Sequence, residues 1–173
     1  MSRLVIVSGP PGAGKSTVAG LLARRWERGV HLHTDDFHAW IVRGHIDPWR
    51  PESAAQNDIV RDAMIAAART YAEGGYDVAV DGVAGPWVLA SWRAIGLPID
   101  YVVLRPSLAE TERRAATRVG HALKDLGAVT TMHHAFADLG DLEHHALDTT
   151  DLDARATVAE VERRLQAGAL RLT

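Results

Sequence analysis

The sequence predicts an α/β fold with three layers, in which helices cover both faces of a mostly parallel five-stranded sheet. Short apolar runs alternate with longer segments of helical period, which is the pattern of parallel strands joined by helices. The chain has 173 residues, 47% of them hydrophobic, so one core can form without a metal or disulfide staple. Because no repeat or low-complexity tract divides the pattern, we expect a single domain over residues 1–173.

The strands and helices are predicted from apolar runs and their period. Strands are expected at residues 4–7, 30–34, 77–80, 100–104 and 144–147. Helices are expected from about Lys15, over 51–74, over 107–118, near 130–138, and around Val158 to Leu165. Residues 37–50 show no clear period and predict a loop or a broken helix. The helix over 51–74 is predicted to bury Ile59, Val60, Ala63, Met64, Ala67 and Tyr71.

Charge and composition exclude several classes of function. The 19 Lys and Arg against 22 Asp and Glu give a net charge of −3, which argues against nucleic acid or an anionic membrane as the main partner. The absence of cysteine excludes disulfides, thiolate zinc sites and cysteine nucleophiles. The first apolar run is too short for a signal peptide, and no run is long enough to span a membrane. We therefore expect a cytoplasmic protein.

A phosphate-binding loop is predicted between the first strand and the first helix. Residues 9–16 read G-P-P-G-A-G-K-S and match G-x-x-x-x-G-K-[ST], with an apolar strand before and an amphipathic helix after. Pro10 and Pro11 lack an N–H, so the amides that hold phosphate oxygens must come from residues 12–16. Lys15 is expected to reach the β- and γ-phosphates of a nucleotide, and Ser16 to ligate Mg²⁺. The predicted nucleotide-binding residues of this loop are Gly9, Gly12, Ala13, Gly14, Lys15, Ser16 and Thr17.

From residue 4 to residue 165 the chain resembles the small P-loop kinases, in particular the chloramphenicol-phosphotransferase-like and AAA-type small-molecule kinases. The landmarks of this resemblance, in order, are residues 9–17, 34–37, 80–82, 107–118 and 148–150. The resemblance implies a three-layer P-loop NTPase fold of the nucleoside-kinase type with a small helical lid at about 113–130. It also implies ATP and Mg²⁺ as cofactors.

The resemblance assigns roles to residues at the carboxyl ends of the strands. It implies that Asp35 is the base that accepts the proton of the substrate hydroxyl, although a helix N-cap is an alternative for this residue. It places Arg114 and Arg118 in the lid as catalytic arginines, although a solvated helix face explains them nearly as well. Asp148, Thr149 and Thr150 resemble the loop beside adenine, with a polar turn as the alternative.

The acceptor is expected between the loop after the second strand, the 51–74 helix and the turn after the third strand. Asp81 ends the third strand and could hold Mg²⁺ or its water, bond the substrate, or simply form a turn with Gly82. Each tryptophan here, taken alone, is better explained by the core than by a pocket. The predicted substrate-binding residues are Asp35, His38, Trp40, Arg43, Trp49, Asn57, Asp81 and Trp87, and the predicted metal ligands are Ser16 and Asp81.

We therefore expect an ATP-dependent phosphotransferase that moves the γ-phosphate to a hydroxyl of a small metabolite or antibiotic, acting as a monomer or homodimer. A non-catalytic ATP-binding regulator and a nucleoside monophosphate kinase are the alternatives. Only four arginines lie between residues 36 and 76, which slightly favours an uncharged or weakly charged acceptor. A GTPase is disfavoured because the chain has no N-K-x-D motif, and a mechanical ATPase because such modules are larger.

Overall fold

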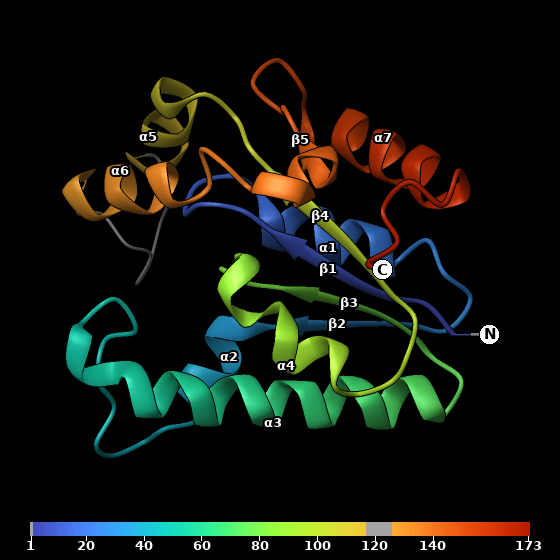
Figure 1. Cartoon of the computed structure of the whole chain (residues 1–173), viewed down its shortest axis with the longest axis horizontal. Helices are drawn as coiled ribbons and strands as arrows, with labels where there is room; N and C mark the ends of the chain where they lie inside the picture. The colour runs from blue at the N-terminus through green and yellow to red at the C-terminus, as the bar shows by residue number, and fades with distance from the viewer. Residues whose placement is uncertain (1, 117–125) are drawn as a thin grey trace.

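The computed structural model describes residues 2–116 and 126–173 (Figure 1). Its centre is a parallel five-stranded sheet in the order β2-β3-β1-β4-β5, so the phosphate-loop strand lies in the middle. In register, Leu4 faces Val78 of β3 on one side and Ile99 of β4 on the other. The strands are β1 (Leu4–Ser8), β2 (Gly29–His33), β3 (Asp77–Asp81), β4 (Ile99–Leu104) and β5 (Ala146–Leu147).

Helices follow the strands in the sequence. The α-helices are α1 (Lys15–Ala23), α2 (Thr34–Ala39), α3 (Ala54–Glu73), α4 (Leu89–Arg93), α5 (Leu108–Ala116), α6 (Leu126–Ala135) and α7 (Ala154–Gln166). Short 3-10 turns occupy Pro51–Ser53, Pro86–Val88 and Gly140–His145.

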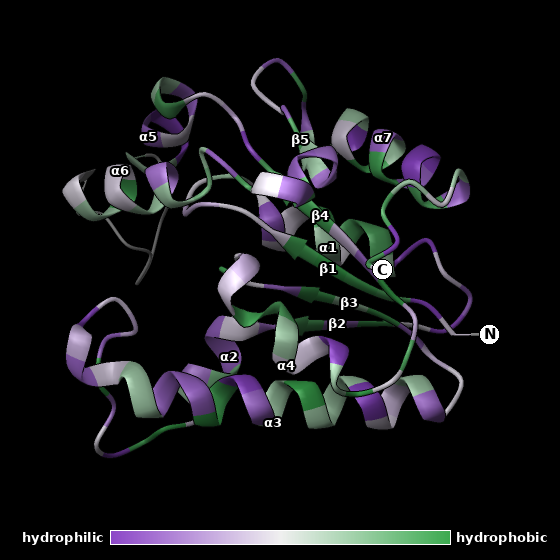
Figure 2. Ribbon diagram, viewed as in Figure 1, coloured by the Kyte–Doolittle hydropathy of each residue, from purple (hydrophilic) through white to green (hydrophobic). Residues whose placement is uncertain are grey.

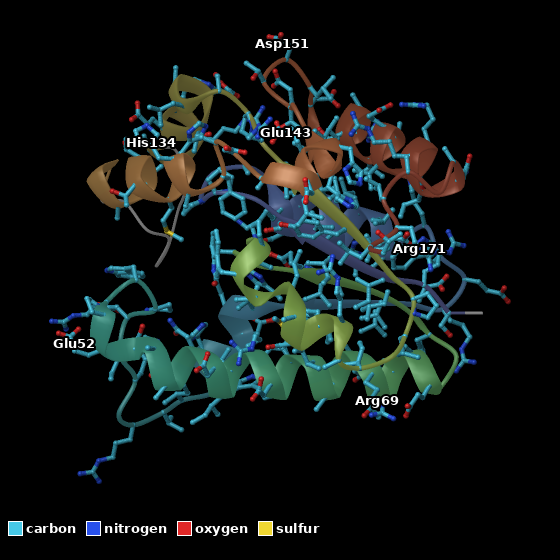
Figure 3. All side chains as sticks on the ribbon, in the orientation of Figure 1. Glu52, Arg69, His134, Glu143, Asp151 and Arg171 are labelled. Atoms are coloured by element: carbon cyan, nitrogen blue, oxygen red, sulfur yellow. The ribbon has the colours of Figure 1, made fainter. Side chains whose placement is uncertain are left out.

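Alternate residues of β1 point into two separate hydrophobic clusters, one on each face of the sheet. Leu4 and Ile6 pack with residues of α2, α3 and α4, whereas Val5 and Val7 pack with residues of α1 and α7. The hydropathy colouring shows the central strand β1 as apolar, and all five of its residues are buried, as expected for a parallel sheet covered by helices (Figure 2). Figure 3 shows side chains filling the space between α3 and the sheet. The predicted three-layer α/β class and the parallel five-stranded sheet are confirmed.

The structure corrects several predicted boundaries. β2 ends at His33, because Thr34 already begins α2, and β5 is only Ala146–Leu147, because the residues before it form a 3-10 turn. Residues 37–50 were expected to form a loop or a broken helix, and the first three of them belong to α2, which ends at Ala39. Helix α4 was not predicted, since Leu89–Arg93 is too short to show a helical period.

The predicted apolar face of α3 is wrong at three positions. Its buried residues are Val60, Met64 and Ala68, spaced four apart, whereas Ile59 is 70% exposed, Tyr71 is 43% exposed, and Ala63 is exposed too. The stripe that meets the sheet is therefore narrower than the apolar residues of the helix suggest.

Within the two described stretches, no helix is both long and apolar enough to cross a membrane.

Candidate functional site

The loop between β1 and α1 has the backbone shape that an anion-binding cradle requires. Gly9, Gly12 and Gly14 have positive φ angles of 139°, 88° and 90°. A Cβ at Gly9 would lie 2.2 Å from the carbonyl oxygen of Leu104, and one at Gly12 would lie 2.6 Å from that of Thr111. A Cβ at Gly14 would meet nothing within 4 Å. The first two glycines therefore permit packing, and the third borders open space.

Helix α1 begins at Lys15 directly after this loop. The first N–H groups of a helix have no carbonyl partner in a preceding turn, and they form the positive end of the helix dipole. The ammonium of Lys15, a residue only 7% exposed, donates to the carbonyl oxygen of Pro10 at 2.8 Å, so its side chain folds back over the loop. The amides and the ammonium together suit a phosphate chain.

Asp81 is the best-connected carboxylate at the carboxyl edge of the sheet. It is 1% exposed and ends β3. The hydroxyl of Ser16 donates to its Oδ2 at 2.7 Å. Two imidazoles from β2 complete the cluster, with His31 Nε2 2.5 Å from Oδ1 and His33 Nδ1 3.1 Å from Oδ2. Because His33 faces Asp81 in the β2–β3 register, this contact follows from strand pairing.

These contacts set the charge of the cluster. Burial alone would raise the pKa of Asp81, but the hydrogen bonds from His31, His33 and Ser16 outweigh it and hold that pKa well below its usual range. The hydrogen bond to Asp81 in turn raises the pKa of His33, against the opposing effect of burial. An ionised carboxylate 2.7 Å from a hydroxyl is a pair of hard oxygen donors, which fits Mg²⁺.

Asp35 lies at the mouth of the same edge, in the first turn of α2. Its side chain is 81% exposed, and its Oδ2 is 3.7 Å from His33 Nε2. His33 thus stands between Asp35 and Asp81. The hydroxyl of Thr34 donates to the backbone carbonyl of Asp81, which fixes the start of α2 against the end of β3.

One large cavity of about 1240 Å³ joins these groups to the region between α2, α3 and α4. Of the predicted acceptor residues it is lined by Asp35, His38, Trp49, Asn57, Asp81 and Trp87, together with Lys15 and Ser16. Trp40 and Arg43 are not among the lining residues. Trp40 is 69% exposed and packs its ring against Phe37 at a centroid distance of 4.6 Å.

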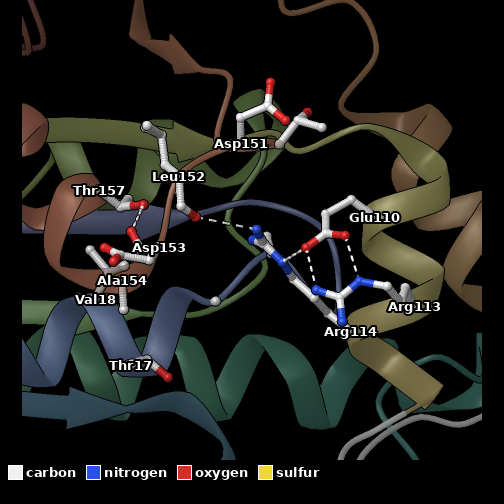
Figure 4. Close-up of a pocket in the computed structure, with 13 residues that line it drawn as sticks. Thr17, Val18, Glu110, Arg113, Arg114, Asp151, Leu152, Asp153, Ala154 and Thr157 are labelled. Carbon is white, nitrogen blue, oxygen red and sulfur yellow. Dashed lines mark hydrogen bonds and ion pairs between the residues drawn. The ribbon is translucent and has the colours of Figure 1, made fainter.

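A second cavity of about 480 Å³ lies on the other side of the phosphate loop, between α1, α5 and the loop before α7 (Figure 4). Ala13, Gly14, Thr17, Arg114 and Thr150 line it. The lining does not include Asp148 or Thr149. The Asp148 carboxylate instead accepts hydrogen bonds from the backbone amide of Thr150, at 2.9 Å, and from the Thr150 hydroxyl. These two bonds shape the turn.

Arg114 is held in place on the wall of this second cavity. Its Nε donates to Glu110 at 2.5 Å, and a terminal nitrogen donates to the carbonyl of Thr149 at 3.0 Å. The hydrogen bonds to Arg113 and Arg114 lower the pKa of Glu110 to about 2. The backbone amide of Glu110 donates to the Ser107 hydroxyl at 3.3 Å, so Ser107 caps the start of α5. The Glu110 carboxylate does not bond back to Ser107 but accepts from Arg113 and Arg114. Arg118 lies outside the described residues.

Several residues of the site did not emerge from the sequence. His31 and His33 were recognisable as sharing one face of a strand, but their partner Asp81 was not, because the order of β2 and β3 in the sheet was unknown. Once the order of the strands in the sheet is known, pairing β2 with β3 in parallel register places His33 beside Asp81 and predicts this contact. His45, Asp47 and Arg61 also line the large cavity and carried no motif.

This loop, on the central strand of a sheet ordered β2-β3-β1-β4-β5, defines a P-loop nucleotide-binding protein. Residues 5–131 match the family model described as AAA domain, and the chain belongs to that family. No curated protein matches the chain.

Solved structures of small P-loop kinases share its fold over nearly its whole length. The tunicamycin resistance protein of Deinococcus radiodurans has 16% identity and a TM-score of 0.72, covering 100% of this chain and 99% of that one. A gluconokinase from Sinorhizobium meliloti has 20% identity and a TM-score of 0.67, with 96% and 93% covered. A shikimate kinase from Bacteroides thetaiotaomicron has 13% identity and a TM-score of 0.69, with 95% and 98% covered.

Proposed function

We propose that the protein is an ATP-dependent phosphotransferase that moves the γ-phosphoryl group to a hydroxyl of a small molecule. The observation that carries the proposal is that Lys15, Ser16, Asp35 and Asp81 all line one cavity. A phosphate-binding lysine, a hard-oxygen metal pair and an exposed carboxylate are the parts that phosphoryl transfer to an alcohol needs. The similarity in fold to solved small-molecule kinases supports the same activity.

In this proposal the nucleotide lies across the phosphate loop. The amides of residues 12–16 and the Lys15 ammonium bind the β- and γ-phosphates, and the Thr17 hydroxyl bonds the α-phosphate. The base and ribose occupy the smaller cavity, beside Arg114 and the turn at residues 148–150. The opening at Gly14 provides the space for the phosphate chain, because a Cβ there would meet nothing within 4 Å.

Ser16 and Asp81 would hold Mg²⁺ in this arrangement. When bound there, the ion neutralises charge on the β- and γ-phosphates. Asp81 is ionised at neutral pH, since its pKa lies well below the usual range. His31 and His33 orient the carboxylate, so that Oδ2 stays beside the Ser16 hydroxyl.

Asp35 is the proposed base. It accepts the proton of the acceptor hydroxyl while that oxygen forms a bond to the γ-phosphorus and the bond to the ADP oxygen breaks. Its exposure on the cavity wall leaves the carboxylate accessible to a substrate. We place the closing lid at about 113–130, with Arg114 on its described part and Arg118 beyond it.

The proposal is tested by following ADP formation from ATP and Mg²⁺ with a coupled assay. A panel of hydroxyl metabolites, nucleotides and antibiotics is added one at a time. We expect at least one compound to stimulate turnover, and the variant Lys15→Ala to lose about 10²-fold or more of that rate. ATP binding without stimulation by any compound would instead support a non-catalytic ATP-binding regulator.

A further inference from the structure

The acceptor cavity carries an excess of carboxylates in the part formed by residues 47–61. Asp47, Asp58 and Arg61 line it. The guanidinium of Arg61 donates to Asp58 at 2.7 Å and, through two nitrogens, to Asp62 at 3.2 Å. One cation therefore already faces two carboxylates. Among the residues that the structure describes, the Asp47 side chain has no hydrogen-bond or ion-pair partner.

In the part of the cavity formed by residues 47–61, no lysine or arginine without an ion-pair partner is present to bind an anionic acceptor. Arg61 is the one arginine among the described residues lining the cavity, and its charge is already neutralised. Lys15 belongs to the phosphate loop. A carboxylate or phosphate on the acceptor would thus meet the Asp47 carboxylate, which has no cationic partner among the described residues, and this repulsion disfavours it.

A buried imidazole in the same cavity lacks a partner. His38 lines the wall and is 9% exposed, and its Nδ1 has no hydrogen-bond partner among the described residues. Burial lowers the pKa of His38, which favours the neutral ring. A buried nitrogen without a partner costs free energy, and a ligand hydroxyl or amine offsets that cost if the ring turns its Nδ1 toward the cavity.

Two tryptophans supply the apolar part of the wall. Trp49 and Trp87 line the cavity and keep 48% and 58% of their surfaces exposed. Exposed indole faces bind apolar or sugar-like surfaces, and they also attract ammonium groups. The volume of about 1240 Å³ is more than a compact metabolite fills.

We propose that the acceptor is a hydroxylated amine, positively charged and bearing an apolar or aromatic portion. This rests on the proposed phosphotransferase function and deepens it. The ammonium group lies near Asp47, beside the Asp58–Arg61 ion pair. The apolar portion lies against Trp49 and Trp87, and the reacting hydroxyl points toward Asp35.

The test uses three phenyl glycosides built on one sugar ring. Phenyl β-glucoside is neutral, phenyl β-glucosaminide carries an ammonium group in place of the 2-hydroxyl, and phenyl β-glucuronide carries a carboxylate in place of the 6-hydroxymethyl group. Their dissociation constants are measured by calorimetry on the full chain with Mg²⁺ and a non-hydrolysable ATP analogue, so that binding is separated from turnover. We expect the glucosaminide to bind about tenfold or more tighter than the glucuronide, and also tighter than the glucoside. Equal or tighter binding of the glucoside or glucuronide, or no binding of the glucosaminide, would overturn the proposal.

A pair of variants locates the selectivity. Asp47→Asn should reduce the preference for the glucosaminide over the glucoside to about one third or less. The control Asp141→Asn, which changes an exposed carboxylate outside the cavity lining, should leave it unchanged. An unchanged preference in Asp47→Asn would overturn the assignment.

The same sugars are then tested for phosphorylation with ATP. Transfer to the glucuronide as efficient as to the glucosaminide would refute the charge selectivity while leaving the phosphotransferase function standing. Tight, selective binding of the glucosaminide, with no transfer to it or to any compound of the panel above, would refute the phosphotransferase function and leave the selectivity standing.

Discussion

Replacing Asp81 with asparagine removes the charge on which three side chains converge. Ser16, His31 and His33 all contact this carboxylate, which is 1% exposed. A hydrogen bond to a charged group contributes about 1.5–3 kcal/mol. Asparagine keeps one acceptor oxygen but turns a donor toward the other partners, so we expect a loss of about 3 kcal/mol in the free energy of unfolding. For a chain of this size that lowers Tm by about 6–12 °C.

The same change should weaken the use of Mg²⁺. We expect the half-saturating Mg²⁺ concentration for turnover to rise about tenfold or more, because one of two proposed protein ligands loses its charge. Thermal unfolding and a Mg²⁺ titration of the rate measure the two effects separately. Asp100→Asn is the matched control: Asp100 is also buried and ion-paired, with Arg171, but it lies on β4 and does not line the cavity. An Asp81→Asn variant with unchanged Tm and unchanged Mg²⁺ dependence would refute the reasoning.

Three further changes test other parts of the molecule. Gly14→Val should weaken ATP binding, measured by calorimetry, about 10²-fold or more, because a β-branched residue is strained at a φ of 90° and its side chain enters the space for phosphate. Tight ATP binding by this variant would contradict the phosphate-loop assignment. Arg114→Gln should raise the KM for ATP about tenfold with little change in the KM of the acceptor, and the opposite pattern would move Arg114 to the acceptor side. His145 donates a hydrogen bond from its Nδ1 to the carbonyl of Tyr101, and burial lowers its pKa below the ordinary value of 6.5. The stability that neutral His145 contributes is therefore present above pH 6.5 and is lost as the pH falls through the pKa of the folded state. His145→Asn, which keeps a donor, should therefore lose less stability than wild type in urea unfolding between about pH 7.5 and about pH 5, and an equal loss would contradict this.

The fold was largely predictable because its dominant signals are local. Each buried strand is a short apolar run, and a glycine-rich turn leads directly into Lys15, the first residue of α1. Elements were missed where the pattern is short or ambiguous. Helix α4 has five residues, and Ile59 is an apolar residue on the exposed side of α3.

The site was predictable only as far as motifs reach. The phosphate loop, Asp35 after β2 and Asp81 at the end of β3 follow from sequence position, because parallel strands end at one edge of the sheet. The contact between His33 and Asp81 depends on which strands are neighbours, and the placement of Trp40 depends on how α2 packs. Such properties arise from packing between distant segments, which neither composition nor period encodes.

The most direct test of the central claim follows the phosphoryl group itself. ATP labelled at the γ-phosphorus is incubated with Mg²⁺ and an acceptor that stimulates ADP formation, using wild type, Asp35→Asn and the neighbouring control Asp36→Asn. The account predicts that the label passes into a phosphate ester in step with ADP, that Asp35→Asn slows this by about 10²-fold or more with ATP affinity nearly unchanged, and that Asp36→Asn keeps the rate. Release of the label only as inorganic phosphate, or full transfer by Asp35→Asn, would contradict it.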